Sequence, residues 1–397
     1  MQTNLFRNAT TYTAELPCAE DMRKHLAERP FKQVGENFLS SLGFVENLAT
    51  GELVTEFPGG YSFTARFDEK SIPSGSLAAA YDAAFDKFRE DNNLEADEGI
   101  DKEVRGELKE AVYVEMVKRA ILKAPVYVNC FFHTDSKYLY ITTTSKALTS
   151  SVMSAVIQCV GSVKTSTIWV ADIKGGLTAR LKKYLGQVEY DLPPQLDAFG
   201  VFKIGDALVL KKDSDRVSFN VGNLDIAKHG MIEALGADML CESMVLEHNG
   251  VEFKLTHDFK MRSVKFLEEL DEQEEEERYG DGADGAHIWR LDAGVQTALI
   301  VSTTCALCEM FEYKAPVDGA PLVSSQVVVR SSESEEFTDE NYDEAVILVR
   351  TKNAASISML QRKFKIGYNR AARLIERLED EGVVSAMKSN GSREVLF

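Results

Sequence analysis

Runs of apolar residues, some alternating and some at helical spacing, follow one another along most of this chain. Alternation predicts strands, and apolar residues that recur every three or four positions predict helices. We expect strands at 5–6, 10–16, 61–67, 126–134, 138–145, 199–204, 206–212, 216–221, 239–248, 251–256 and 261–267. We expect helices at 19–28, 76–91, 102–123, 147–162, 178–185 and 226–235, and a last apolar unit at 291–311. The order is not a regular βαβ alternation, so it predicts an α+β fold with antiparallel sheets.

Several of these elements carry their own boundary signals. Ser74 or Ser76 is expected to cap the helix that ends near residue 91, and Ser145 the helix at 147–162. Asp135-Ser136-Lys137 is the expected tight turn between the strands at 126–134 and 138–145. In the helix at 102–123, the expected apolar stripe is Val112, Met116, Val117 and Ile121.

The last 42 residues, 356–397, read as a helix, a turn, a second helix and a β-hairpin. Ser356 suits the cap of the first helix, and Leu360 and Phe364 share one of its faces. Gly367 is expected to make the turn. The second helix is predicted over 368–381, with Gly382 just past its end. Strands at 383–384 and 395–397 are expected to pair around the hairpin turn Asn390-Gly391, which completes a winged helix.

The second helix of this segment has two distinct faces. The stripe expected to be buried consists of Ala371, Ala372, Ile375 and Leu378. The opposite face holds Asn369, Arg370, Arg373, Glu376 and Arg377. Arginine reads guanine, asparagine reads adenine and glutamate accepts from cytosine in the major groove, so this face predicts sequence-specific DNA binding. The alternative is an amphipathic helix with solvated charges.

The segment from 339 to 397 resembles the gamma domain of the FtsK/SpoIIIE DNA translocases, which reads short polar chromosome-orienting sequences. The likeness lies in YDEAV, ASIS, QRKFKIGYNRAARLIE, EGVVS and NGSREVL. It implies base reading by Asn369, Arg370, Arg373 and Glu376, and a place in the wing for Arg393. We expect further wing or phosphate contacts from Arg362, Lys363, Lys365, Arg377 and Lys388. The chain contains no G-x-x-x-x-G-K-[ST] loop of the kind that cradles nucleotide phosphates.

The preceding residues, about 1–312, resemble the recombination-associated RdgC family. The likeness rests on IPSGSL near residue 72, EVRGELKEAVYVEMVKRA and HNGVEFKLTHDFKMRSVKFLEELDEQ. It implies a multi-lobed body that forms a ring-shaped dimer around duplex DNA and restrains RecA-driven recombination. Members can carry a lysine-rich helical hairpin where this chain has the acidic stretch 90–103. We therefore divide the chain into a body (1–315), a flexible linker (316–338) and a winged helix (339–397).

Charge is distributed unevenly along the 397 residues. The net charge is -18, yet residues 345–397 hold ten Lys/Arg and five Asp/Glu. A basic appendage on an acidic body is typical of a DNA-binding module. The mean hydropathy of -0.19, the six scattered cysteines and the apolar-poor N-terminus indicate an intracellular protein, which we expect in the cytoplasm at the nucleoid and not at a membrane.

Other clusters in the body have ordinary explanations. Cys305 and Cys308 form a lone CxxC, expected to be two small buried residues of an apolar helix or strand. The run 268–277 is expected to be a solvated acidic loop, and the six histidines show no metal spacing. We therefore expect no metal, no cofactor and no enzymatic activity. Weak phosphate contacts from the body are expected from Lys118, Arg119, Lys123, Arg180, Lys182, Lys183, Lys211, Lys212, Arg262 and Lys265.

The leading hypothesis is a non-enzymatic, homodimeric protein that binds double-stranded DNA and modulates recombination or protects DNA, with a phage or mobile element as its expected source. A RecA-like recombination protein is the expected protein partner. The alternative is an acidic DNA mimic that inhibits a host recombination or repair enzyme. A metal-dependent exonuclease is the third reading, for which the sequence offers no carboxylate constellation.

Overall fold

The structure, a computed structural model, describes residues 4–95, 99–161, 163–168, 172–186, 196–220, 224–267, 284–313, 341–352, 354–385 and 393–396. The chain divides into two compact units. Unit 1 comprises Met1–Glu28, Phe44–Ala65 and Val128–Val327, and unit 2 comprises Arg29–Gly43, Arg66–Tyr127 and Val328–Phe397. The predicted linker 316–338 and the acidic run 268–277 lie outside the described residues.

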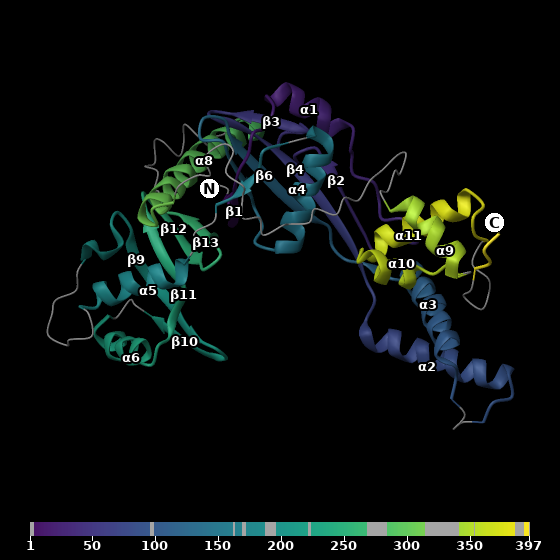
Figure 1. The fold of residues 1–397 in the computed structure, drawn as a ribbon. Coiled ribbons are helices and arrows are strands. Elements are labelled where there is room, and N and C mark those ends of the chain that lie inside the picture. The colour runs from purple at the N-terminus through teal and green to yellow at the C-terminus, as the bar shows by residue number, and fades with distance from the viewer. Residues whose placement is uncertain are drawn as a thin grey trace. The chain divides into compact units, whose positions relative to one another are not determined.

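Unit 1 is built on an antiparallel sheet (Figure 1). Its strands follow the order β10-β9-β11-β12-β13-β1-β7-β6-β4. β1 lies inside the sheet because it pairs with both β13 and β7, with Asn8 opposite Arg262 and Thr10 opposite Ile141. The strands are β1 (Asn8–Thr13), β3 (Val54–Phe57), β4 (Gly60–Ser71), β6 (Val126–His133), β7 (Tyr138–Ile141), β8 (Ser166–Thr167), β9 (Lys203–Lys212), β10 (Asp215–Asn220), β11 (Leu240–His248), β12 (Val251–Thr256) and β13 (Lys260–Phe266). A further strand, β2 (Ser40–Val45), follows β4 in the pairing order, and most of its residues belong to unit 2.

The β11–β12 hairpin shows how local sequence sets the register. Asn249 and Gly250 have φ of 47° and 74°, and a tight two-residue turn needs positive φ at both central positions. The ladder then pairs His248 with Val251 and Ser243 with Thr256. The predicted α+β class with antiparallel strands is confirmed.

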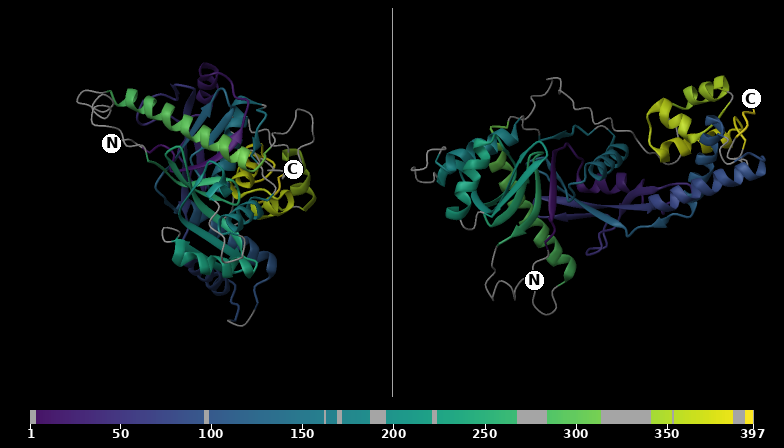
Figure 2. Two further views of the ribbon diagram at one scale, coloured as in Figure 1. Left: turned by 90° about the vertical axis from the view of Figure 1, so that its left-hand side faces the viewer. Right: turned by 90° about the horizontal axis from the view of Figure 1, so that it is seen from below.

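Helices cover this sheet, and the longest is α8 (Gly285–Met310). The others are α1 (Ala19–Ala27), α4 (Lys146–Val160), α5 (Ile173–Tyr184), the 3₁₀ helix η1 (Leu196–Phe199) and α6 (Leu224–Gly236). Figure 2 shows α8 as one continuous helix, and it packs against β3 and β12. It is long and apolar enough to cross a membrane, but 56% of its apolar window is buried inside the protein, as expected of a core helix. Gln296 of α8 accepts a hydrogen bond from the amide of Leu5 at 2.9 Å.

Unit 2 contains a helical hairpin made of α2 (Ser74–Asp91) and α3 (Lys102–Lys118). Ser74 is the first helical residue and Pro73 the cap, so neither serine caps α2 with its side chain. The predicted end of the second helix at residue 123 is also wrong. α3 stops at Lys118, and β5 (Ile121–Leu122) pairs with the end of β4.

The buried stripe of α3 also differs from the prediction. Glu110, Val114 and Val117 are buried, whereas Ile121 lies beyond the helix and is 72% exposed. The physical reason is that α3 has two neighbours. Val112 and Met116 face the cavity beside α2, and Val114 joins the core of the C-terminal helices.

Three helices form the C-terminal part of unit 2: α9 (Tyr342–Lys352), α10 (Ile357–Phe364) and α11 (Tyr368–Asp380). The Ser356 cap is confirmed by a 3.1 Å bond from the amide of Met359, and Gly382 follows α11 with φ of 70°. Val384 and Val395 form a β-bridge. The turn residue was predicted wrongly: Lys365 takes the left-handed conformation with φ of 53°, while Gly367 caps α11 with φ of -72°. Asn390-Gly391 lies outside the described residues.

Candidate nucleic-acid interface

The buried face of α11 holds the three helices together. Ala371, Ala372, Ile375 and Leu378 are buried as predicted, and Leu374 is buried as well. These side chains share one core with α9 and α10. Because these apolar side chains are buried on one face of α11, Arg370, Arg373 and Glu376 lie on its other side. This is the arrangement of a helix-turn-helix whose second helix presents a polar face.

The residues expected to read bases make contacts within unit 2. The guanidinium carbon of Arg373 lies 5.4 Å from the ring centre of Phe38. An oxygen of Glu376 accepts a hydrogen bond of 2.9 Å from the side-chain amide of Asn37. Arg370 is half-buried, and Asn369 belongs to α11, although its side chain lies outside the described part of the chain. Two of the four expected reading residues therefore touch the segment Arg29–Gly43.

The cations expected at the wing and the phosphates fall into two groups. Lys363 and Lys365 are exposed, and so is Arg362, which donates to the carbonyl of Ser358. Arg393 is instead almost completely buried: its side chain is 8% exposed and lies 3.9 Å from Glu379. Lys388 lies outside the described residues.

Arg377 belongs to a small network that joins α9 to the end of α11. It donates to Glu381 at 2.8 Å and stacks 4.0 Å from the ring centre of Tyr342. Tyr342 donates to the other oxygen of Glu381 at 2.6 Å. The hydrogen bonds from Tyr342 and Arg377 lower the pKa of Glu381, and burial raises the pKa of Tyr342 to about 12.

A carboxylate from α3 binds the start of α10. Glu110 is 7% exposed and accepts from the amide of Ile357 at 2.6 Å, with the amide of Ser358 at 3.4 Å from its second oxygen. Ser356 already accepts from Met359. The first three amides of α10, which have no partner inside the helix, are thus all satisfied.

Apolar and aromatic contacts extend from the same face of α3. Val114 lies one turn after Glu110 and belongs to the core of the C-terminal helices. Tyr113 packs edge-on against Tyr368, with ring centres 5.2 Å apart. Sequence reasoning missed this face. The available signal was an acid, Glu110, at stripe spacing from Val114 and Val117, where an apolar residue is expected.

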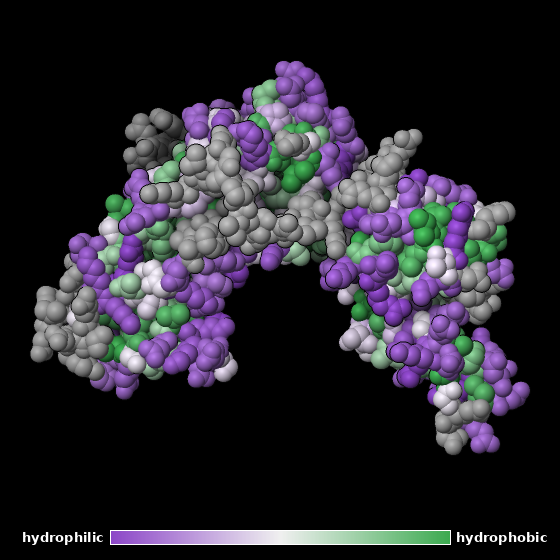
Figure 3. All heavy atoms as spheres, viewed as in Figure 1, coloured by the Kyte–Doolittle hydropathy of each residue, from purple (hydrophilic) through white to green (hydrophobic). Residues whose placement is uncertain are grey.

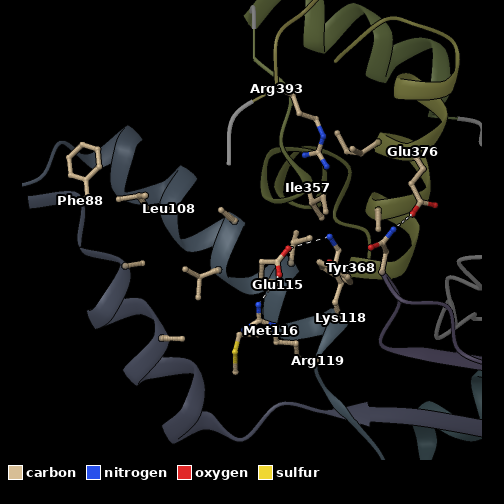
Figure 4. Close-up of a pocket in the computed structure, with 18 of the residues that line it drawn as sticks. Phe88, Leu108, Glu115, Met116, Lys118, Arg119, Ile357, Tyr368, Glu376 and Arg393 are labelled. Atoms are coloured by element: carbon tan, nitrogen blue, oxygen red, sulfur yellow. Dashed lines mark hydrogen bonds and ion pairs between the residues drawn. The ribbon is translucent and has the colours of Figure 1, made fainter. Parts of the chain in front are cut away.

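A cavity of about 940 Å³ lies between the α2–α3 hairpin and the helices α10 and α11 (Figure 4). Phe88 and Leu108 form part of its apolar wall, while Lys118, Arg119 and Glu376 belong to its polar lining. Arg393 reaches into the cavity from the C-terminal segment. The surrounding surface carries mainly hydrophilic side chains with scattered apolar ones (Figure 3).

The ten cations expected to give weak body contacts are mostly engaged with acids. Ion pairs join Lys118 and Arg119 to Glu115, Lys123 to Glu69, Lys183 to Asp197, Lys212 to Asp238 and Lys265 to Glu252. Arg180 is different, because it donates to the carbonyl of Met310 and lies beside Phe311. Lys182 and Lys211 are half-buried, and Arg262 is exposed. Exposed ion pairs are worth roughly 0–1 kcal/mol, so phosphates could replace these carboxylates at small cost.

Among the described residues, no group of three or more His, Cys, Asp or Glu side chains could hold a metal ion. Cys305 and Cys308 both lie in α8, as the apolar-element reading predicted, but Cys305 is exposed rather than buried. Burial raises the pKa of both thiols, to about 11 for Cys308, so neither is poised as a thiolate.

Comparison with known proteins identifies the C-terminal segment. Residues 336–397 match the family described as "Ftsk gamma domain". The segment is 61% identical over 66 residues to the DNA translocase FtsK of Shewanella oneidensis, 64% over 59 residues to that of Pseudomonas putida and 57% over 62 residues to the DNA translocase SpoIIIE of Bacillus subtilis. These matches cover 15–17% of this chain and only 7–8% of each relative. The chain therefore carries an FtsK gamma domain. These matches do not extend to the other parts of the translocases.

The remainder of the chain has a different relationship. Residues 5–311 match the family described as "Putative exonuclease, RdgC". This match spans the sheet of unit 1 and the α2–α3 hairpin, and it ends just after α8. It covers well over half of the 397 residues. The chain belongs to the RdgC family.

Proposed function

We propose that this protein is a non-enzymatic, double-stranded-DNA-binding protein that modulates recombination or protects DNA at the nucleoid. Its gamma domain reads a short asymmetric site through Asn369, Arg370, Arg373 and Glu376. The observation that carries the proposal is the gamma domain itself, whose relatives at 57–64% identity are DNA translocases. The polar face of α11 supplies the side-chain types that recognise base edges.

The body adds a second, sequence-independent contribution in this proposal. Its exposed cations exchange carboxylates for phosphates and release counterions from DNA. The body acts as a dimer around or against the duplex, and a RecA-like recombination protein is its protein partner. A phage or mobile element that borrowed a host orienting signal would be a natural source for such a fusion.

Two DNA-binding parts on one chain should act together. We expect the full-length protein to bind a long duplex with one G-rich site more tightly than either residues 1–325 or residues 335–397 alone. Joining two modules replaces a second bimolecular step by an intramolecular one, which can raise affinity by about 10²–10⁴ without new contacts. The salt dependence should also be steeper than that of the gamma domain, because more phosphates are neutralised.

Titration of the three proteins on one duplex at two salt concentrations tests this proposal, with a scrambled duplex as the control. An acidic body that mimics DNA would repel the duplex. In that case the full-length protein would bind no more tightly than its C-terminal fragment and with the same salt slope. That result would contradict the proposal that the body binds duplex DNA.

A further inference from the structure

We propose that α3 and the segment Arg29–Gly43 form a dock for the chain's own gamma domain, and that docking keeps the base-reading face of α11 away from DNA. The dock consists of Asn37, Phe38, Glu110, Tyr113 and Val114. All of its contacts lie within unit 2. The proposal rests on the function proposed above, because it concerns the availability of the same reading face.

The first step concerns Glu110, whose carboxylate hydrogen-bonds to the start of α10 although the residue itself belongs to α3. A carboxylate that is 7% exposed is costly to bury unless its oxygens are hydrogen-bonded. Glu110 finds its described partners at residues 357 and 358, some 250 positions away. A negative charge at the start of a helix is further stabilised by the helix dipole.

The second step is that the same surface covers residues expected to read DNA. Arg373 stacks on Phe38 and Glu376 accepts from Asn37. A base edge requires the same guanidinium and carboxylate, and the major groove must admit the whole face of the helix. Asn37 and a base therefore compete for Glu376. Arg393, whose side chain is only 8% exposed, is also withdrawn from any phosphate in this arrangement.

The third step is charge. Residues 74–118, which span the α2–α3 hairpin, hold twelve Asp/Glu and six Lys/Arg, for a net charge of -6. Residues 345–397 hold ten Lys/Arg and five Asp/Glu, for a net charge of +5. Opposite charges favour docking and weaken it as salt rises, so the acidic hairpin stands in for the polyanion that the gamma domain binds.

Reading then requires release from the dock. The apparent Kd for DNA rises by the inverse of the released fraction, so a dock that is closed nine times in ten weakens binding about tenfold. This loss is smaller than the gain of about 10²–10⁴ that comes from linking two modules. Docking and tandem binding are therefore compatible in one protein.

Full-length Glu110→Ala tests the dock, with Glu107→Ala as the matched control, since Glu107 is an exposed acid one turn earlier on the same helix. Two readouts are needed: amide exchange of residues 357–359 without DNA, and titration of a labelled G-rich duplex and its scrambled counterpart. In Glu110→Ala we expect faster exchange at 357–359 and about tenfold tighter binding of the G-rich duplex. Glu107→Ala should match the unmodified protein in both.

Two outcomes overturn the proposal. Unchanged exchange in Glu110→Ala means that Glu110 does not hold α10 in solution. Faster exchange with unchanged DNA affinity means that the dock does not control reading. Where circular dichroism shows that Glu110→Ala is misfolded, Asn37→Ala carries the test, with severalfold tighter binding expected and equal affinity contradicting it. If no variant distinguishes the two duplexes, the proposed function fails, and the exchange measurement still decides whether docking occurs.

Discussion

The guanidinium of Arg373 and the carboxylate of Glu376 can each engage only one partner at a time. A DNA base would compete for them with Phe38 and Asn37. In the structure these groups contact Phe38 and Asn37. In the proposed DNA complex the guanidinium of Arg373 would pair with the two acceptor atoms of guanine, a contact worth about 1–3 kcal/mol of discrimination. At the scale of single residues, the groups that pack against Phe38 and Asn37 are therefore the same groups that we propose for base recognition.

Within the isolated segment 335–397, Arg373→Ala should cost roughly 1–3 kcal/mol of affinity for the G-rich duplex and remove most of the preference over a scrambled one. Arg362→Ala is the control, because Arg362 is expected at a phosphate. It should weaken binding to both duplexes equally and reduce the salt slope by about one. An Arg373→Ala fragment that still prefers the G-rich duplex as strongly as the parent would contradict the assigned reading role. Fluorescence titration of both variants measures these differences.

At the scale of elements, the C-terminal helices were largely predictable because their signals are local. Ser356, Gly382 and the apolar stripe of α11 each fix a boundary or a face from a few neighbouring residues. The helix α3 was less predictable because its burial depends on two neighbours distant in sequence. An acid at position 110 has no local reason to be buried, and only the amides of α10 explain it. The assignment of Asn369, Arg370, Arg373 and Glu376 as base-reading residues rests on the polar face of α11 together with the family likeness, and it stays a prediction.

We expect residues 335–397 to fold alone, because α9, α10 and α11 share one core and the Glu381 network closes their ends. The pKa of Glu381 is lower in the folded state than its ordinary value of 4.5. Its ionised form therefore stabilises the fold above pH 4.5, and this contribution is lost as pH falls through the lowered folded pKa.

Thermal unfolding of this segment between pH 6 and pH 3 checks the expectation. The parent should lose more stability across this range than Glu381→Gln, which has no carboxylate to protonate. Glu344→Gln serves as the control, since Glu344 is exposed on α9 and should leave the pH dependence nearly unchanged. Equal pH profiles for the parent and Glu381→Gln would show that the network contributes nothing, and a segment without a cooperative transition would show that it does not fold alone.

At the scale of the whole molecule, the body should be at least a dimer without DNA and inert toward it. The family likeness motivates the dimer, and the family description "Putative exonuclease, RdgC" is the reason to test the expected inertness. Sedimentation velocity measures the first property. Incubation of labelled duplex with Mg²⁺ or Mn²⁺ measures the second, and no nucleotide release is expected. Release that disappears on mutating an Asp or Glu of the body would establish a nuclease instead.

The position of β1 in the sheet has a consequence for biosynthesis. Its partners come from far along the chain: Asn8 lies opposite Arg262, and the amide of Leu5 bonds to Gln296, 291 residues away. Contacts of such high sequence separation form slowly, because a long loop must close first. The opening strand of a growing chain can pair with β7 early, but its β13 side must wait until residues 260–266 have left the ribosome. The first described helix of the gamma domain begins with Tyr342, 32 residues after α8 ends at Met310, and the helices of this domain contact one another locally. The gamma domain can therefore complete its own core before the body has closed.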